Sequence, residues 1–338
     1  MCSKHGLRIH INGIIQGVGF RPFVYGLATQ LALAGWVRNT SAGVDIEVEG
    51  ERENLETFYQ SLTEEAPPLA QIDSIERETY KPNGFTTFEI VHSEAVPDAF
   101  QPISPDVCIC DNCLQELFDP QNFRYRYPFI NCTNCGPRFT IIKDIPYDRP
   151  LTTMAPFAMC PACATEYEDP LNRRFHAQPV ACSACGPHVW LKFTDQSSKK
   201  KKRSKEEKEQ TNQGDKAIIK SQDLLSAGRI IAIKGLGGFH LACDAENPAA
   251  VSLLRDRKNR PSKPLALMMP DLKTIAEHCY LNDQERDLLT SRQRPIVLLS
   301  QRPESTIATQ VAPGQKTLGV MLPYTPLHYL LFAQEDRY

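Results

Sequence analysis

Eight cysteines in four C-x2-C pairs occupy the middle of this sequence and predict metal binding. The pairs are separated by 18, 24 and 18 residues, so a C-x2-C-x18-C-x2-C unit occurs twice. Two residues between cysteines allow a tight turn to aim both sulfurs at one ion, and four thiolates close a tetrahedral zinc site at Zn–S distances of about 2.3 Å. The sequence therefore predicts two structural zinc ions. The expected ligands are Cys110, Cys113, Cys132, Cys135, Cys160, Cys163, Cys182 and Cys185.

The spacing leaves open which pairs share an ion. Neighbouring pairs are the simpler arrangement, and a crossed one, first pair with fourth and second with third, is the alternative. A disulfide framework or a redox dithiol is a weaker interpretation, because four regularly spaced pairs stand in a long chain whose N-terminus lacks a secretion signal's apolar core. We interpret Cys108 as a bystander, and His176 and His188 as surface or packing residues.

A glycine-rich turn near the N-terminus is the second segment that could do chemistry. Gly17 and Gly19 allow backbone N–H groups to face one point at the start of a helix, where the helix dipole is positive. Arg21 follows, and its planar guanidinium can bind two oxygens at once. The turn therefore predicts a phosphate or carboxylate site. Its expected residues are Gln16, Gly17, Val18, Gly19, Phe20 and Arg21.

The elements around this turn follow from hydrophobic periodicity. Leu7–Ile11 alternates as a strand does, and Phe23–Ala34 repeats at helical spacing up to Gly35. The remaining expected elements are strands at 36–39, 44–49, 72–80 and 85–91 and a helix at 54–62. The order strand, helix, strand, strand, helix, strand, with a possible extra edge strand, predicts a split βαβ domain over residues 1–92.

The run from Gln16 to Arg21, followed by Asn39, resembles acylphosphatase, a small ferredoxin-like βαββαβ enzyme that hydrolyses acyl phosphates. The resemblance implies that the loop and Arg21 hold the phosphoryl group and that Asn39 positions the attacking water. It implies no catalytic metal. Arg21 and Asn39 are thus the expected catalytic residues.

Two charged or proline-rich segments predict linkers around the cysteine region at 108–190. The first is 93–107, which holds three prolines. The second is 191–216, which contains the basic run Lys199–Lys208. Such a run can contact RNA, but this one alternates into glutamates and lacks apolar residues, which favours a solvated linker.

Residues 217–338 predict a third, α/β domain. A helix at 218–225 and a strand at 229–234 precede a glycine run, and a helix at 249–258 leads into a basic, proline-rich loop. An apolar strand ending at Met268, a helix at 272–279 and a strand at 295–299 are expected to follow. These segments resemble the YrdC/Sua5 domain, which binds ATP and makes acyl-adenylates. The resemblance implies an ATP site, with Mg2+, near one set of polar residues. These are Lys234, His240, Asp244, Lys258, Arg260 and Lys263.

The order of the three domains resembles that of the HypF family, the carbamoyltransferases of [NiFe] hydrogenase maturation. Its most specific segments are 131–140 and 173–179. The resemblance implies hydrolysis of carbamoyl phosphate to carbamate, carbamoyl-adenylate formation with ATP and, in the full-length family, transfer to the C-terminal cysteine of HypE for cyanide synthesis. Because the chain stops at Tyr338, we expect an incomplete YrdC-like domain and no C-terminal transferase domain.

Composition bounds the other interpretations. A net charge of −2 argues against general nucleic-acid affinity, and no apolar run reaches the length of a membrane span. We predict a cytoplasmic α+β multidomain protein with neither membrane nor nucleic acid as partner. The alternatives are a zinc-dependent nucleic-acid-binding protein, a tRNA threonylcarbamoyl-adenylate synthase-like enzyme, and a scaffold of inactive modules.

Overall fold

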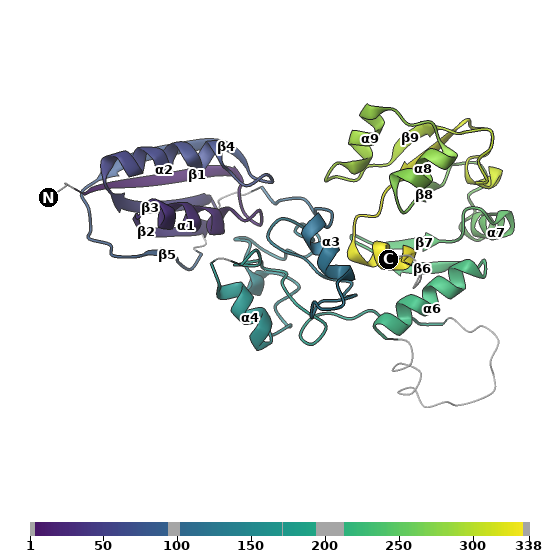
Figure 1. The fold of residues 1–338 in the computed structure, drawn as a ribbon, viewed down its shortest axis with the longest axis horizontal. Helices are drawn as coiled ribbons and strands as arrows, with labels where there is room; N and C mark the ends of the chain where they lie inside the picture. The colour runs from purple at the N-terminus through teal and green to yellow at the C-terminus, as the bar shows by residue number, and fades with distance from the viewer. Residues whose placement is uncertain (1–3, 94–101, 171, 194–212, 334–338) are drawn as a thin grey trace. The chain divides into compact units, whose positions relative to one another are not determined.

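The computed structural model of the chain describes residues 4–93, 102–170, 172–193 and 213–333 (Figure 1). The chain divides into two compact units, one of residues 1–113 and 130–186, the other of residues 114–129 and 187–338. The predicted linkers 93–107 and 191–216 lie partly outside the described residues, and the basic run Lys199–Lys208 lies wholly outside them.

A five-stranded sheet and two helices form the N-terminal part of the first unit. The strands lie in the order β4-β1-β3-β2-β5. All neighbouring pairs are antiparallel except β2–β5, which is parallel. The elements are β1 (His5–Ile14), α1 (Phe20–Gln30), β2 (Ala34–Thr40), β3 (Gly43–Gly50), α2 (Arg52–Glu64), β4 (Gln71–Tyr80) and β5 (Phe88–Ile90). This confirms the predicted ferredoxin-like plan, with β5 as the extra strand at the edge beside β2.

The core of this part lies between the sheet and both helices. Alternate residues of β1, such as Ile9 and Ile11, are fully buried, as the period of a strand with one covered face requires. Val24 of α1 and Phe58 of α2 belong to the same buried cluster. Each such side chain contributes about 1.5–3 kcal/mol by leaving water, so the core holds β1 and α1 firmly on either side of the glycine-rich turn.

The predicted bounds of the first helix were wrong at both ends. α1 begins at Phe20, because Gly19 caps it in a left-handed conformation with φ 80°. It ends at Gln30, before Gly35, because Ala32 adopts φ 52° and the N–H of Leu33 bonds to the carbonyl of Ala28 at 2.9 Å. The earlier start places Arg21 in the first turn of the helix.

The cysteine region contains little regular structure. Two short helices, α3 (Asp111–Phe118) and α4 (Pro161–Glu168), each follow the first cysteine of a pair. A 3-10 turn, η1 (Arg149–Leu151), lies between the second and third pairs. Side-chain contacts to backbone carbonyls and the cysteine clusters hold these loops, in place of an extended sheet.

Two small sheets and several helices form the C-terminal part of the second unit. A hairpin joins β6 to β7, and the second sheet has the order β8-β10-β9. The elements are α6 (Asp215–Ser226), β6 (Ile231–Lys234), β7 (Phe239–Ala242), α7 (Pro248–Lys258), β8 (Ala266–Met268), α8 (Leu272–His278), α9 (Asp283–Thr290), β9 (Val297–Ser300), η2 (Thr309–Val311), β10 (Thr317–Met321) and α10 (Pro326–Phe332). Five of these, β7, α9, η2, β10 and α10, were not predicted from the sequence.

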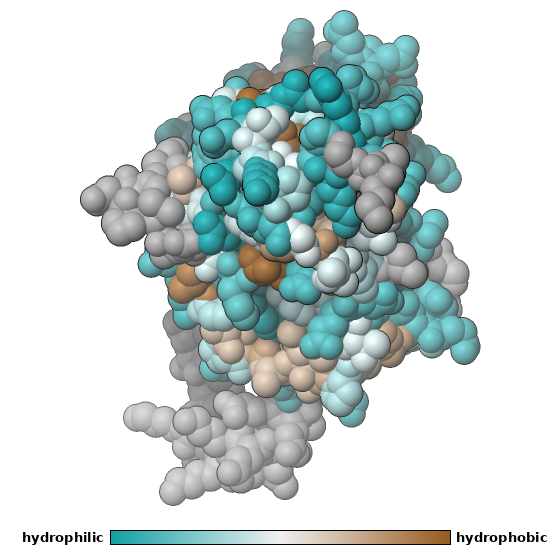
Figure 2. All heavy atoms as spheres, turned by 90° about the vertical axis from the view of Figure 1, so that its left-hand side faces the viewer, coloured by the Kyte–Doolittle hydropathy of each residue, from teal (hydrophilic) through white to brown (hydrophobic). Residues whose placement is uncertain are grey.

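The surface is mostly polar on the face drawn in Figure 2, where small apolar areas lie between hydrophilic side chains. Among the residues that the structure describes, no helix combines the length and the apolar character needed to cross a lipid bilayer.

Candidate active site and metal centres

The glycine-rich turn joins β1 to α1 and forms a cradle of backbone groups. Gly17 has φ 71° and Gly19 has φ 80°, both in the left-handed region that favours glycine. The N–H of Phe23 bonds to the carbonyl of Gly19, so the helix starts directly from the loop. The N–H groups of the loop and the positive end of α1 therefore lie at one place, as an anion site needs.

Arg21 and Asn39 lie side by side at this turn, although they come from α1 and β2. Both are buried, with exposed fractions of 8% and 1%. With its amide oxygen turned toward Arg21, Asn39 accepts hydrogen bonds from Nε and Nη2 at 3.1 Å each. Nη1 donates to Ser93 Oγ at 3.2 Å, and Nη2 also donates to Asp148 Oδ1 at 2.8 Å. The guanidinium is thus held in one orientation by three neighbours.

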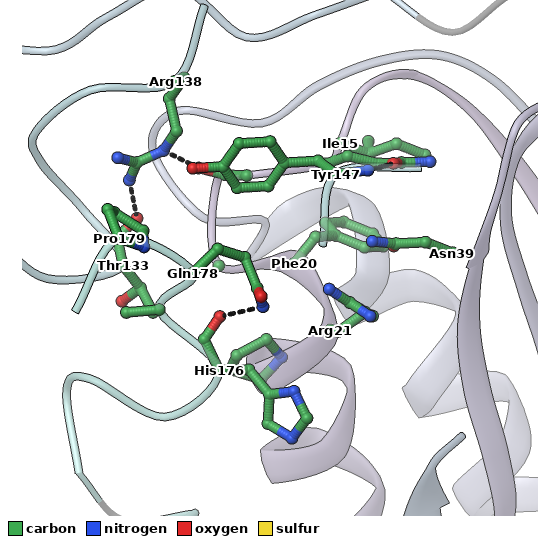
Figure 3. A pocket seen from close by; sticks show the side chains of 15 residues that line it. Ile15, Phe20, Arg21, Asn39, Thr133, Arg138, Tyr147, His176, Gln178 and Pro179 are labelled. Atoms are coloured by element: carbon green, nitrogen blue, oxygen red, sulfur yellow. Dashed lines mark hydrogen bonds between the residues drawn. The ribbon is translucent and has the colours of Figure 1, made fainter. Parts of the chain in front are cut away.

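A pocket surrounds Arg21, and residues of the cysteine region form part of its wall (Figure 3). The residues contributed by that region are Thr133, Arg138, Tyr147, His176, Ala177, Gln178 and Pro179. They were not predicted to contribute to this site, because they lie more than 90 residues from Arg21 along the chain. The structure thus brings Arg21, Asn39 and most of the predicted loop to one pocket and adds a second wall to it.

His176 both packs and lines the pocket. Its ring lies 5.0 Å from that of Tyr167 and 4.6 Å from that of Phe175, as expected of a packing residue. Burial, reinforced by the positive charge of Arg21, lowers its pKa from 6.5 to about 4. A neutral imidazole therefore faces the pocket near pH 7.

Gln16 connects the loop to two neighbouring segments by hydrogen bonds. Its Nε2 donates to the carbonyls of Thr40 and Gly43 at 2.7 and 3.0 Å, and its Oε1 accepts from the backbone N–H of Tyr147 at 3.0 Å. The side chain thus joins the loop to the β2–β3 turn and to the cysteine region.

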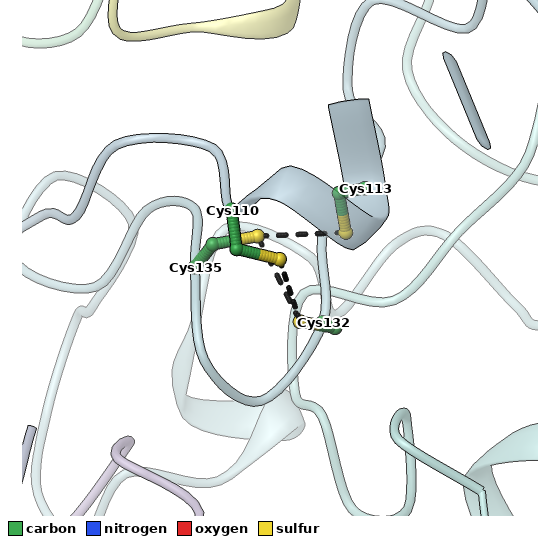
Figure 4. Close-up of side chains that lie close together, drawn as sticks. All are labelled: Cys110, Cys113, Cys132 and Cys135. Atoms are coloured by element: carbon green, nitrogen blue, oxygen red, sulfur yellow. Dashed lines mark hydrogen bonds between the residues drawn. The ribbon is translucent and has the colours of Figure 1, made fainter. Parts of the chain in front are cut away.

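The eight predicted cysteine ligands form two clusters of four, and neighbouring pairs share each cluster. This resolves the pairing that the spacing left open. Four sulfurs about 2.3 Å from one ion would be about 3.8 Å apart. In the first cluster the separations from Cys110 to Cys132 and from Cys132 to Cys135 are 3.7 and 3.8 Å (Figure 4). In the second, Cys160–Cys182, Cys182–Cys185 and Cys185–Cys163 lie 3.7, 3.8 and 3.7 Å apart. Both donor sets fit a structural zinc ion.

Hydrogen bonds to sulfur support the first cluster. Arg173 Nη2 donates to Cys113 Sγ at 3.1 Å, and the backbone N–H of Asn134 donates to Cys132 Sγ at 3.4 Å. Four thiolates and one Zn2+ carry a net charge of about −2, which a neighbouring guanidinium stabilises. Cys108 is a member of neither cluster.

The predicted nucleotide residues fall into two groups in the second unit. Lys234, His240 and Asp244 lie on or just after the β6–β7 hairpin, where Lys234 Nζ is 4.9 Å from the ring centroid of Phe239. The others, Lys258, Arg260 and Lys263, lie at the end of α7 and in the loop that follows it. Arg260 donates to the carbonyl of Pro264 at 3.0 Å, which fixes the course of this loop.

His328 is a polar residue of this region that was not among the predicted site residues. It is 4% exposed, and its ring is stacked 6.1 Å from that of His240. Burial and the neighbouring His240 lower its pKa to about 4. No sequence signal pointed to His328. It is linked to the predicted His240 only by the fold, which places α10 beside the β6–β7 hairpin.

Comparison with family models divides the chain in the same order. The acylphosphatase model matches residues 7–90, and the HypF finger model matches residues 109–142 and 159–192. A third model, of the Sua5/YciO/YrdC family and described as telomere recombination, matches residues 223–337.

Known proteins resemble the chain over nearly its whole length. Carbamoyltransferase HypF2 of Cupriavidus necator is 50% identical over 334 residues, which are 97% of this chain and 39% of that protein. The crystal structure of full-length HypF in the phosphate- and nucleotide-bound form has a TM-score of 0.87 and 46% identity, over 98% of this chain and 41% of that one. Over a shorter stretch, an acylphosphatase of Caldivirga maquilingensis is 40% identical over 93 residues, which are 27% of this chain and 97% of that protein. The chain therefore spans about two-fifths of the HypF proteins and nearly all of an acylphosphatase.

Proposed function

This chain belongs to the HypF family, and from that premise we propose that it hydrolyses carbamoyl phosphate to carbamate and phosphate in the pocket around Arg21. The observation that carries the proposal is the placement of the Arg21 guanidinium and the Asn39 amide together beside the glycine loop. These are the groups that bind an anion and orient a water molecule.

The proposed reaction transfers the phosphoryl group to water. The water oxygen forms a bond to phosphorus while the bond from phosphorus to the acyl oxygen breaks; the electron pair leaves with carbamate, and the protons of the water remain on the phosphate product. Negative charge on the phosphoryl oxygens is stabilised by the guanidinium of Arg21 and by backbone N–H groups of the loop at Gly17, Val18 and Gly19. Asn39 positions the water. These steps require only charge stabilisation and positioning by residues of this chain.

The role of Asn39 gives the first test. We expect Asn39→Ala to lower kcat for carbamoyl phosphate about a hundredfold, because the attacking water loses its partner. The dissociation constant of inorganic phosphate should change less than the rate, because Arg21 and the loop remain. Calorimetric titration and phosphate release measure the two quantities, and thermal unfolding checks that the variant is folded. A variant that hydrolyses at the wild-type rate would contradict the role.

We further propose that each cysteine cluster holds one structural Zn2+. The separations between sulfurs and the match to the HypF finger model support this. A closed four-thiolate site has no open position for substrate, so the ions order the loops around the pocket and take no part in the reaction.

The third proposal concerns the second unit. By its family membership, the segment at 223–337 binds ATP with Mg2+ and forms carbamoyl-adenylate, and HypE is the acceptor of the carbamoyl group in the complete protein. Three cationic side chains around the α7–β8 loop, Lys258, Arg260 and Lys263, are suited to the phosphates of ATP. Calorimetric titration with Mg-ATP tests this. Binding that weakens in Lys263→Ala supports the assignment, and the absence of binding to the wild type contradicts it.

A further inference from the structure

Arg138 links the first cysteine cluster to the phosphate loop. It is 1% exposed, and its guanidinium donates to backbone carbonyls on both sides. Toward the cluster, Nη1 bonds to Cys135 O at 2.8 Å and Pro137 O at 3.0 Å. Nη2 bonds to Thr133 O at 2.8 Å and Cys132 O at 3.4 Å. Toward the loop, Nε donates to the carbonyl of Gly17. One buried cation thus joins two segments that are 121 residues apart.

The contact fixes a peptide unit that the proposed reaction needs. In a trans peptide the C=O of one residue and the N–H of the next point in opposite directions. Because Arg138 holds the carbonyl of Gly17, the N–H of Val18 points away from Arg138. The orientation of one backbone donor of the loop is therefore set by a side chain from the cysteine region.

Packing also restricts rotation of the Gly17–Val18 peptide. A Cβ at Gly17 would lie 3.1 Å from Arg138 Cδ and 3.2 Å from the ring of Tyr147. The backbone N–H of Tyr147 also donates a hydrogen bond to the side chain of Gln16, the residue before Gly17. The cysteine region therefore grips the loop at two consecutive residues, by hydrogen bonds as well as by contact.

We propose that Arg138 is a positioning residue for phosphate binding, acting through the Gly17–Val18 peptide from its anchorage on the first cysteine cluster. This inference rests on the proposed acylphosphatase site. It adds that a side chain of the cysteine region takes part in orienting the phosphate loop of this chain.

The test uses the full chain loaded with zinc and compares Arg138→Ala with Arg255→Ala. Arg255 is a matched control because it is also buried and donates to the carbonyls of Gln310, Arg260, Lys263 and Val311, within the second unit. We expect the dissociation constant of inorganic phosphate to rise about tenfold or more in Arg138→Ala, which corresponds to the loss of one charged hydrogen bond. It should stay unchanged in Arg255→Ala.

Two further readouts separate positioning from general damage. Added guanidinium chloride at millimolar concentration should restore phosphate affinity to Arg138→Ala in part, and Arg138→Lys should raise the KM for carbamoyl phosphate more than it lowers kcat. Unchanged phosphate affinity in Arg138→Ala would overturn the proposal. So would an equal loss in both alanine variants, or a loss that guanidinium does not relieve. Phosphate binding is measured without turnover, so these outcomes stand apart from whether the wild type hydrolyses carbamoyl phosphate.

Discussion

At the scale of single residues, the contact between Arg21 and Asp148 governs how the pocket receives an anion. The carboxylate lies 2.8 Å from Nη2 of Arg21, and its side chain is 25% exposed. A phosphate that binds to Arg21 meets this negative charge at close range, and the two repel each other. In the proposed reaction, Asp148 therefore weakens the binding of substrate and of product phosphate.

Removing that charge should strengthen phosphate binding. We expect Asp148→Asn to lower the dissociation constant of inorganic phosphate about three- to tenfold, because the repulsion is lost while Arg21 remains. Calorimetric titration measures the change. Asp144→Asn is the matched control, since Asp144 is an exposed acidic residue of the same loop. Weaker binding in Asp148→Asn would contradict this prediction and show that the orientation of Arg21 by the carboxylate outweighs the repulsion.

His176 makes the stability of the first unit depend on pH. Its pKa of about 4 lies below the ordinary 6.5, so between these values the unfolded chain binds a proton that the folded chain excludes. Stability therefore falls as the pH decreases from 6.5 to 4. We expect His176→Asn, which tolerates the left-handed φ of 54°, to reduce that fall by about 1–3 kcal/mol.

Urea unfolding of the first unit at about pH 7 and about pH 4.5 checks the prediction for His176. The control is His92→Asn, an exposed histidine of the first unit. An acid-induced loss of stability that is the same in wild type and His176→Asn would contradict the assignment.

At the scale of elements, the glycine-rich turn needs glycine at position 17 for two reasons: a positive φ and a lack of space for a Cβ. Gly17 and Gly84 both have positive φ, 71° and 90°, but of the two only Gly17 has neighbours within 4 Å of the position that a Cβ would take. We expect Gly17→Ala to lower the free energy of unfolding by about 2–3 kcal/mol and Gly84→Ala by about 1–2 kcal/mol. Urea unfolding of both variants measures this. Equal losses of stability in the two variants would contradict the steric contribution and show that Arg138 and Tyr147 shift to make room for the methyl group.

The N-terminal elements could be predicted because each carries its own periodic signal. Leu7–Ile11 alternates, and its alternate residues are buried in β1. The end of α1 could not be predicted, because Ala32 adopts a left-handed conformation that its residue type does not favour. β10 was missed for a different reason: it is stabilised by pairing with β8 in parallel and with β9, and such partners leave no local signal.

At the scale of the whole molecule, the two cysteine clusters should determine whether the first unit is ordered. We expect about two zinc ions per chain, and removal by a chelator should lower the midpoint of thermal unfolding by at least about 10 °C. Metal analysis and calorimetry measure both. Cys132→Ser should lose one ion, whereas the control Cys108→Ser should keep both. A Cys132→Ser chain with its full zinc content would contradict the first cluster.

Only the part of the candidate site that lies in a local sequence motif could be predicted. Gln16 to Arg21 form one continuous segment, and Asn39 lies near the end of β2, the strand that follows α1, so the motif and the resemblance identified them. Arg138, Tyr147 and Asp148 reach the same pocket from more than 100 residues away. Contacts at that separation depend on how the cysteine region folds against the sheet, which neither composition nor periodicity records.

The central claim is tested most directly by the release of inorganic phosphate from carbamoyl phosphate, without added ATP or metal, by wild type and Arg21→Ala. We expect hydrolysis by the wild type and a loss of at least about a hundredfold in the variant, because the transition state loses its principal cation. A folded, zinc-loaded wild type that releases no phosphate would contradict the proposed function, as would a variant as active as the wild type.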